Sequence, residues 1–101
     1  MAGTKAASLY GVSDARESFY CRYGLNPAYR DGLERAGLIV SAVGDDGEVR
    51  MMELRDHPFF IGTLFVPQAR STRESPHPVI RAFVDAARLA ALRKFRNTSP
   101  A

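Results

Sequence analysis

Apolar and polar positions along the chain follow different periods in different segments, and these periods predict its elements. From residue 78 onward, Ile80, Phe83, Val84, Ala87 and Ala91 recur at helical spacing. This pattern predicts an amphipathic helix at the C-terminal end. We expect its apolar stripe to cover one face of a sheet.

Two shorter helices are predicted in the first third of the chain. The stretch "GTKAASLYG" predicts a helix over residues 4–10, with Gly11 as its stop. Asn26 is suited to an N-cap and Pro27 to the first helical position. Apolar residues at helical spacing and a stop at Gly37 then predict a helix over residues 27–36.

The remaining apolar stretches predict strands. The aromatic-rich "SFYCRYGL" indicates a strand over residues 18–23. Two β-leaning runs around "GDDG" at 44–47 predict a hairpin, and "FFIGTLFV" between Pro58 and Pro67 predicts a neighbouring strand. In "MM" at 51–52, only one side chain can face the core.

Together these elements predict an α+β fold. Its sheet would be mostly antiparallel, with three to four strands, one long C-terminal helix and one or two short helices. At 101 residues, with 46% apolar and 25% charged residues, the chain is expected to form one domain over residues 1–96. Residues 97–101 are predicted to be a flexible tail.

Charge and cysteine content narrow the classes of function. The net charge of +3 comes mainly from basic residues near the C-terminus and in a polar loop, and it is too sparse to favour a nucleic-acid partner. No apolar run is long enough to cross a bilayer, and the first residues lack the apolar core of a secretory signal. A single cysteine cannot form an internal disulfide, so we expect a reduced, cytoplasmic location.

The residues that often bind metals or phosphates are sparse. His57 and His77 each precede a proline, without cysteine partners or metal-ligand spacing. We therefore assign them structural roles, at a strand entrance and at a helix start. No glycine-rich phosphate loop is present, and we predict neither a metal site nor a cofactor.

The order of several motifs carries a resemblance to a known family. "GTKAASLYG", "ESFYCRYGLNPAY", "LERAGLIVSAVGDDGEVRMMELRDHPFFIGTLFVPQ" and "HPVIRAFVDAA" follow one another along the chain. This series resembles the C-terminal portion of the class I glutamine amidotransferase domain of CTP synthases, and stand-alone relatives of that domain even more closely. The resemblance covers residues 3–87.

The resemblance implies where the family's working residues fall. Its catalytic triad is Cys-His-Glu, and the histidine and glutamate positions correspond to Val66 and Gln68. An arginine that contributes to glutamine binding in the family corresponds to Arg22, followed by Tyr23. Arg22 and Tyr23 are therefore the candidate ligand-binding residues.

These replacements remove the acid–base chemistry of the triad. A thiol that attacks a carboxamide needs a base to take its proton; valine has no atom that accepts one, and a neutral glutamine cannot stabilise an imidazolium. The glycine-flanked nucleophile segment of the family has no counterpart in this sequence. Cys21, inside a predicted strand, is interpreted as a structural thiol.

We therefore predict a non-catalytic, glutamine amidotransferase-like protein that acts as a binding or assembly module. An exposed sheet edge is expected to bind a second copy or another protein, and Arg22 is expected to retain weak affinity for a glutamine-like ligand. The alternatives are one half of a split amidotransferase completed by another chain, a small basic module that binds nucleic acid or an acidic partner, and a remnant without a selected function.

Overall fold

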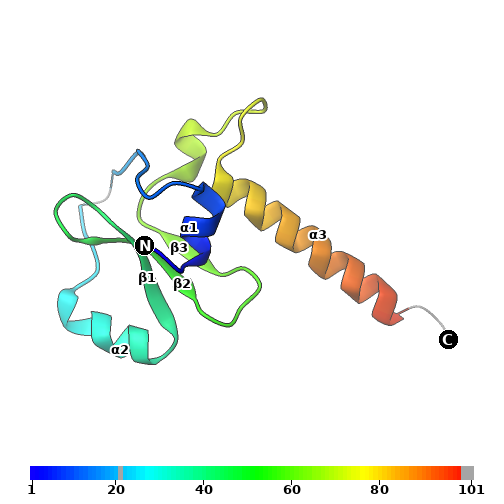
Figure 1. The fold of residues 1–101 in the computed structure, drawn as a ribbon, viewed down its shortest axis with the longest axis horizontal. Helices are drawn as coiled ribbons and strands as arrows, with labels where there is room; N and C mark the ends of the chain where they lie inside the picture. The colour runs from blue at the N-terminus through cyan, green and yellow to red at the C-terminus, as the bar shows by residue number, and fades with distance from the viewer. Residues whose placement is uncertain (21, 99–101) are drawn as a thin grey trace.

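The computed structural model describes residues 1–20 and 22–98 as an α+β fold around one small antiparallel sheet (Figure 1). The chain order of its elements is α1 (Lys5–Tyr10), η1 (Pro27–Tyr29), α2 (Arg30–Arg35), β1 (Leu38–Val43), β2 (Val49–Leu54), β3 (Ile61–Thr63), η2 (Pro67–Arg70) and α3 (Pro78–Thr98). The predicted fold class is confirmed.

The sheet has three strands in the order β1-β2-β3, and both pairs are antiparallel. The hairpin between β1 and β2 turns at the predicted "GDDG", where Gly47 has a φ of 80°. Such a φ is strained for residues with a Cβ, which explains a glycine there. The third strand is confirmed, but it covers only Ile61–Thr63, the middle of the predicted apolar run.

The predicted helix at residues 4–10 is α1, and both of its ends are capped. The Thr4 side chain accepts a hydrogen bond from the backbone N–H of Ala7, and Gly11 ends the helix with a φ of 71°. A third cap comes from β2: the Glu53 carboxylate, 4% exposed, accepts from the N–H groups of Lys5 at 2.8 Å and Ala6 at 3.0 Å. This buried side chain fixes the start of α1 against the sheet.

The predicted helix at residues 27–36 forms in two pieces. Asn26 caps the N–H of Ala28, and Pro27 opens the short 3₁₀ turn η1, which leads directly into α2. The helix ends before Gly37, whose φ is 106°.

The core lies between α1, the sheet and the start of α3. Ala6, Met51, Phe65 and Val79 form its buried cluster. Along β2, Val49, Met51 and Glu53 are buried while the residues between them are half-buried, so only one of the two adjacent methionines faces the core, as expected.

The strand predicted at residues 18–23 does not form in the part of that segment that the structure describes. Residues 18–20 and 22–23 have no strand assignment, and Tyr20 and Tyr23 are exposed. The Ser18 carbonyl accepts one hydrogen bond, from the N–H of Val66 at 2.7 Å, and the described residues of this segment belong to no strand. Aromatic residues favour a strand only where a neighbouring strand and a surface receive them. Cys21 lies outside the described residues.

The expectation that the C-terminal helix covers a sheet face is wrong. Val79 enters the core and Phe83 makes an edge contact with Phe59, with ring centroids 5.8 Å apart. Beyond these first turns, α3 projects away from the body of the molecule (Figure 1). Its length exceeds that of the small sheet, so most of its apolar positions have no surface beneath them.

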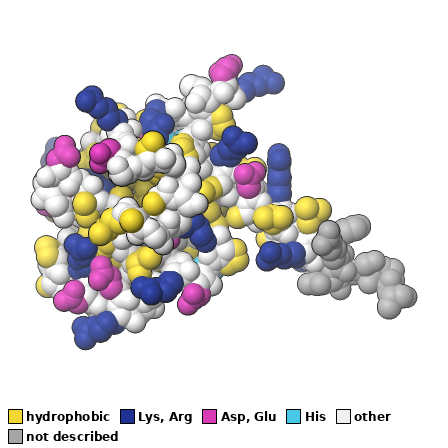
Figure 2. Space-filling model, viewed as in Figure 1, with side chains coloured by type: hydrophobic (Ala, Val, Ile, Leu, Met, Phe, Trp, Pro, Cys, Tyr) yellow, Lys and Arg dark blue, Asp and Glu magenta, His cyan; other side chains and the backbone are white. Residues whose placement is uncertain are grey.

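The projecting part of α3 carries exposed apolar and basic side chains together (Figure 2). The exposed apolar residues of this part are Val84, Leu89 and Leu92, and they continue from the partly exposed Phe83. The helix extends to Thr98, so the flexible tail predicted from residue 97 is helical in its first two positions, and its remainder lies outside the described residues. Among the described helices, none is long and apolar enough to span a bilayer.

Candidate functional site

The segment that follows β3 holds the two triad positions predicted from the sequence. Val66 is the N-cap of η2 and is half-buried, while Gln68 lies within η2 and is exposed. The hydrogen bond from Val66 to Ser18 places the segment of residues 17–20 directly beside them. The fold therefore brings together the two segments that the resemblance assigns to triad and ligand binding.

Arg22 and Tyr23 lie further along the second of these segments. Both side chains are exposed, and Tyr23 is 86% exposed. Neither makes a hydrogen bond or ion pair with a described residue. They are free to contact a ligand or partner, but the fold does not build an enclosed pocket around them.

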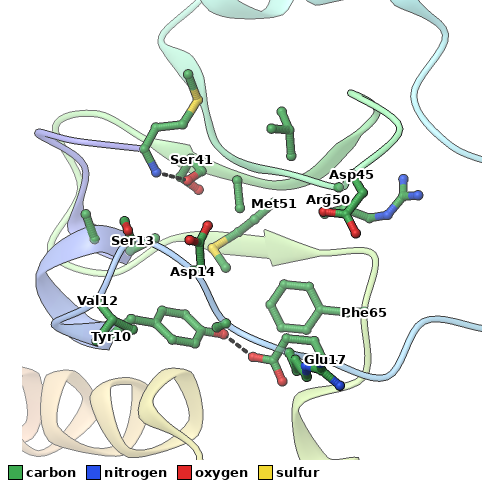
Figure 3. Close-up of a pocket in the computed structure, with 18 of the residues that line it drawn as sticks. Tyr10, Val12, Ser13, Asp14, Glu17, Ser41, Asp45, Arg50, Met51 and Phe65 are labelled. Carbon is green, nitrogen blue, oxygen red and sulfur yellow. Dashed lines mark hydrogen bonds between the residues drawn. The ribbon is translucent and has the colours of Figure 1, made fainter.

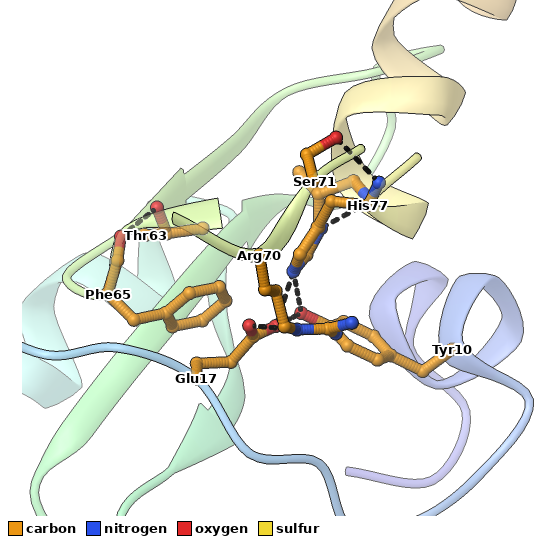
Figure 4. A network of polar contacts seen from close by, with 8 residues as sticks. Tyr10, Glu17, Thr63, Phe65, Arg70, Ser71 and His77 are labelled. Atoms are coloured by element: carbon orange, nitrogen blue, oxygen red, sulfur yellow. Dashed lines mark hydrogen bonds and ion pairs between the residues drawn. The ribbon is translucent and has the colours of Figure 1, made fainter. Parts of the chain in front are cut away.

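A polar network next to these segments was not anticipated from the sequence. It centres on the carboxylate of Glu17, 10% exposed, which receives donors from three directions (Figure 4). Nε of Arg70 donates to Oε1 at 2.6 Å and Nη2 donates to Oε2 at 3.1 Å. The Tyr10 hydroxyl also donates to Oε2. The network thereby ties α1 and η2 to the segment before Ser18.

His77 completes the network and also begins α3. Its ring is fully buried, and its Nδ1 accepts a hydrogen bond from the N–H of Val79 at 3.1 Å. Nδ1 therefore carries no proton, and Nε2 is the nitrogen that donates to Oε2 of Glu17 at 2.5 Å. The predicted structural role of His77 at a helix start is confirmed, with the ring itself as the cap.

The network shifts the pKa values of its members in opposite directions. Burial alone raises the pKa of Glu17, but the hydrogen bonds from its three donors outweigh burial and lower the pKa below the ordinary 4.5. Burial, reinforced by the hydrogen bond to Glu17, raises the pKa of Tyr10 far above the ordinary 10.0. At neutral pH the carboxylate is thus ionised and the phenol is neutral.

The network does not have the geometry of a catalytic base. Both nitrogens of His77 are occupied, and the ring has no exposed surface. A general base must reach the proton that it takes, and this imidazole is enclosed. The network instead has a structural role, because it joins α1, η2 and the start of α3 to the segment that contains Glu17. Within residues 1–20 and 22–98, no group of His, Cys, Asp or Glu side chains has the arrangement of a metal site.

Comparison with known proteins shows what this chain is similar to. No protein-family model matches the chain. The CTP synthase of Rubrobacter xylanophilus is 45% identical over 100 residues, which are 98% of this chain and 18% of that protein. The CTP synthase of Roseiflexus castenholzii is 46% identical over 86 residues, 84% of this chain and 16% of that protein.

A solved structure places this similarity within one domain. The Trypanosoma brucei CTPS glutaminase domain with bound acivicin matches 84% of this chain and 34% of its own length, with a TM-score of 0.79 and 33% identity. This chain is homologous to part of the CTP synthase glutaminase domain.

This glutaminase-like chain spans about a sixth of the length of the curated CTP synthases that it matches, from 16% to 18%. Its match to the solved domain includes the α+β arrangement described above. What the sequence did not reveal is the Glu17 network, because nothing in the spacing of Tyr10, Glu17, Arg70 and His77 indicates that they meet.

Proposed function

We propose that this chain is a glutaminase-like module that does not complete the family's amide hydrolysis and acts by binding or assembly. The observation that carries the proposal is Val66, which stands at the N-cap of η2, where the resemblance puts the catalytic histidine. Its side chain cannot accept a proton from a thiol. The one buried imidazole nearby, His77, is fully engaged.

The absence of catalysis is tested by ammonia release from glutamine. We expect the purified chain to release no ammonia above the background rate, since the loss of triad members costs on the order of 10⁴-fold or more in rate. Acivicin, which is bound by the Trypanosoma brucei glutaminase domain, supplies a second readout. Turnover of glutamine, or a stoichiometric acivicin adduct in the intact mass spectrum, would contradict the proposal.

A binding role for Arg22 is the second part of the proposal. Its exposed guanidinium has no acidic partner among the described residues, so it can pair with the carboxylate of a glutamine-like ligand. Isothermal titration with glutamine is expected to give weak, saturable heat that Arg22→Ala abolishes. Arg73→Ala, which also removes an exposed arginine, is the matched control and is expected to leave the heat unchanged.

Assembly is supported by the surface of α3. Leu89 and Leu92 are 56% and 57% exposed on the projecting helix, and apolar side chains gathered in this way favour association. Strands β1 and β3 also form the two edges of the described sheet. We expect light scattering after size exclusion to show a dimer. Leu89→Gln with Leu92→Gln should shift it toward the monomer. A monomeric wild-type chain at high micromolar concentration would exclude self-assembly.

A further inference from the structure

Both histidines of the chain make the same hydrogen bond across a proline. Nδ1 of His57 accepts from the backbone N–H of Phe59 at 3.0 Å, and Nδ1 of His77 accepts from that of Val79 at 3.1 Å. The residue between them is proline in each case. A histidine nitrogen accepts a hydrogen bond only while it carries no proton. Each turn therefore requires the neutral ring, with its proton on Nε2.

A third turn of this kind shows what the histidines add. The side-chain oxygen of Asn26 accepts from the N–H of Ala28 at 3.0 Å, again across a proline. An amide oxygen keeps its lone pairs at every ordinary pH, whereas an imidazole nitrogen loses its lone pair when it takes up a proton. Histidine side chains make that change between about pH 5 and 8. The two His-Pro turns thus differ from the Asn-Pro turn in their response to protons.

The two hydrogen bonds lie where α3 joins the body of the molecule. Val79 is the second residue of α3 and is buried in the core cluster. Phe59 packs against the same cluster and makes the edge contact with Phe83, one turn further along α3. The carbonyl of His77 also accepts from the N–H of Arg81 at 2.9 Å. Both turns therefore help to fix the base of the helix, which then projects from the body (Figure 1).

The surroundings of His77 provide a counter-charge for a protonated ring. Its Nε2 faces the carboxylate of Glu17 at 2.5 Å, and the Tyr10 hydroxyl lies 3.3 Å from the same nitrogen. Arg70 pairs with that carboxylate and offsets part of its charge. Glu17 and Tyr10 also line a cavity of about 960 Å³ beside Ser41 (Figure 3). Because Glu17 is 10% exposed, solvent reaches the network on this side.

The surroundings of His57 are open. Its ring is exposed and makes an edge contact with Phe60, with ring centroids 5.8 Å apart. The ammonium group of Lys5 donates to the carbonyls of His57 and Pro58 at 2.7 Å each, and the exposed Asp56 precedes the histidine in the chain. One cation and one carboxylate therefore flank a ring that exchanges protons directly with water.

We propose that the two His-Pro turns form a pH-sensitive anchor for the base of α3. On mild acidification, Nδ1 of each ring takes up a proton from solvent and becomes a donor. It then faces the N–H of Val79 or Phe59, and because two donors cannot share a hydrogen bond, the base of α3 loosens. Glu17 remains ionised in this range, so His77 keeps that pair. The anchor goes beyond the proposed function and needs no partner, since it joins α3 to its own chain.

Titration of the ¹⁵N-labelled chain from about pH 8 to about pH 5 tests the proposal. Long-range ¹H–¹⁵N spectra report which ring nitrogens carry protons, and both rings are expected to start with the proton on Nε2 alone. The backbone amides of Phe59 and Val79 should then shift with the protonation of their own histidine. The amide of Ala28, capped by Asn26, is the internal control and should show no such transition. Amide exchange at Val79 and Arg81, corrected for its intrinsic dependence on pH, should accelerate about two- to ten-fold, the effect of one lost hydrogen bond.

Two substitutions separate the turns. His57→Asn and His77→Asn each replace the ring nitrogen with an amide oxygen, the acceptor that Asn26 already provides in this chain. Each is expected to abolish the transition at its own amide and to leave the other unchanged. His77→Asn also loses the donor to Glu17, so the wild-type titration and His57→Asn are sufficient to decide the outcome if that variant does not fold.

The double variant Leu89→Gln, Leu92→Gln separates the anchor from assembly. It should show the same transitions at Phe59 and Val79 as the wild type, whether or not the wild type forms a dimer. Three results would overturn the proposal: a protonated Nδ1 in either ring at about pH 8, an amide at Phe59 or Val79 that does not follow its histidine, or unchanged exchange at Val79 across the titration.

Discussion

His77 donates a hydrogen bond from Nε2 to Oε2 of Glu17 at 2.5 Å, and this contact joins two positions that are 60 residues apart in the chain. Its ring is at the start of α3, and the carboxylate belongs to the loop that runs past Val66. The pair therefore couples the projecting helix to the segment that carries the candidate ligand residues.

Removing the carboxylate should strongly destabilise the fold. Glu17→Ala leaves a fully buried imidazole and a half-buried phenol without their acceptor. We expect the free energy of unfolding, measured by urea denaturation, to fall by about 2–4 kcal/mol. The control is Glu34→Ala, which removes a surface pair with Arg30 at 3.2 Å and should cost about 0.2–1 kcal/mol. Equal losses in the two variants would contradict a central role for Glu17.

The lowered pKa of Glu17 predicts a loss of stability in acid. A carboxyl whose pKa is lower in the folded than in the unfolded chain contributes stability above the unfolded value, here 4.5. That contribution should disappear as the pH falls below about 4.5 toward the folded pKa. Chemical denaturation at a series of pH values should show this slope, and Glu17→Gln should flatten it. An unchanged slope in the variant would assign it to other carboxylates.

The raised pKa of Tyr10 predicts a loss of stability at alkaline pH. Its pKa is raised by burial first and by the Glu17 hydrogen bond second, so the folded chain favours the neutral phenol. Its contribution is fully present below the unfolded value of 10.0 and decreases as the pH rises above it. In chemical denaturation at a series of pH values, Tyr10→Phe should remove the loss of stability at alkaline pH and leave the loss of stability in acid unchanged.

Glu53 provides a separate test of how α1 is attached. Glu53→Ala leaves the N–H groups of Lys5 and Ala6 without an acceptor, and should cost about 1–3 kcal/mol. Glu53→Gln keeps one acceptor oxygen and should cost less. Hydrogen exchange at the first amides of α1 should accelerate in the alanine variant; protection equal to that of the wild type would show that the cap is dispensable.

Two valines on α3 distinguish its anchored start from its projecting length. Val79 is 8% exposed in the core and Val84 is 41% exposed. Val79→Ala should reduce stability by about 1–3 kcal/mol, from lost burial and a small cavity. Val84→Ala should change it by less than about 0.5 kcal/mol in a monomer. A larger effect at Val84 that depends on protein concentration would locate an assembly surface there.

The local elements could be predicted because their signals are short-range. The Thr4 cap, the Asn26-Pro27 start and the glycines at positions 11, 37 and 47 act on neighbouring backbone, so the sequence alone located two helices and the hairpin. The strand expected at residues 18–23 shows the limit of this reasoning. Its aromatic residues favour a strand, but the described part of the segment does not join the sheet, although Val66 donates a backbone hydrogen bond to Ser18.

The candidate site also has a part that the sequence predicts and a part that only the fold reveals. The identities of Val66 and Gln68 can be seen in the sequence, and the family resemblance assigns them to the triad positions. The meeting of Tyr10, Glu17 and His77 cannot be seen there, because Tyr10 and His77 lie 67 positions apart in the chain and only the closed fold brings them together.

The sequence by itself determined the class of the fold and the ends of its shorter helices, since these follow from local backbone preferences. It also determined which atoms the side chains of Val66 and Gln68 carry. Only the tertiary structure decided which carboxylates are buried, which tautomer His77 adopts, that α3 projects instead of covering the sheet, and that a cavity forms beside Ser41. These depend on contacts between residues distant in the chain, whose geometry no local pattern encodes.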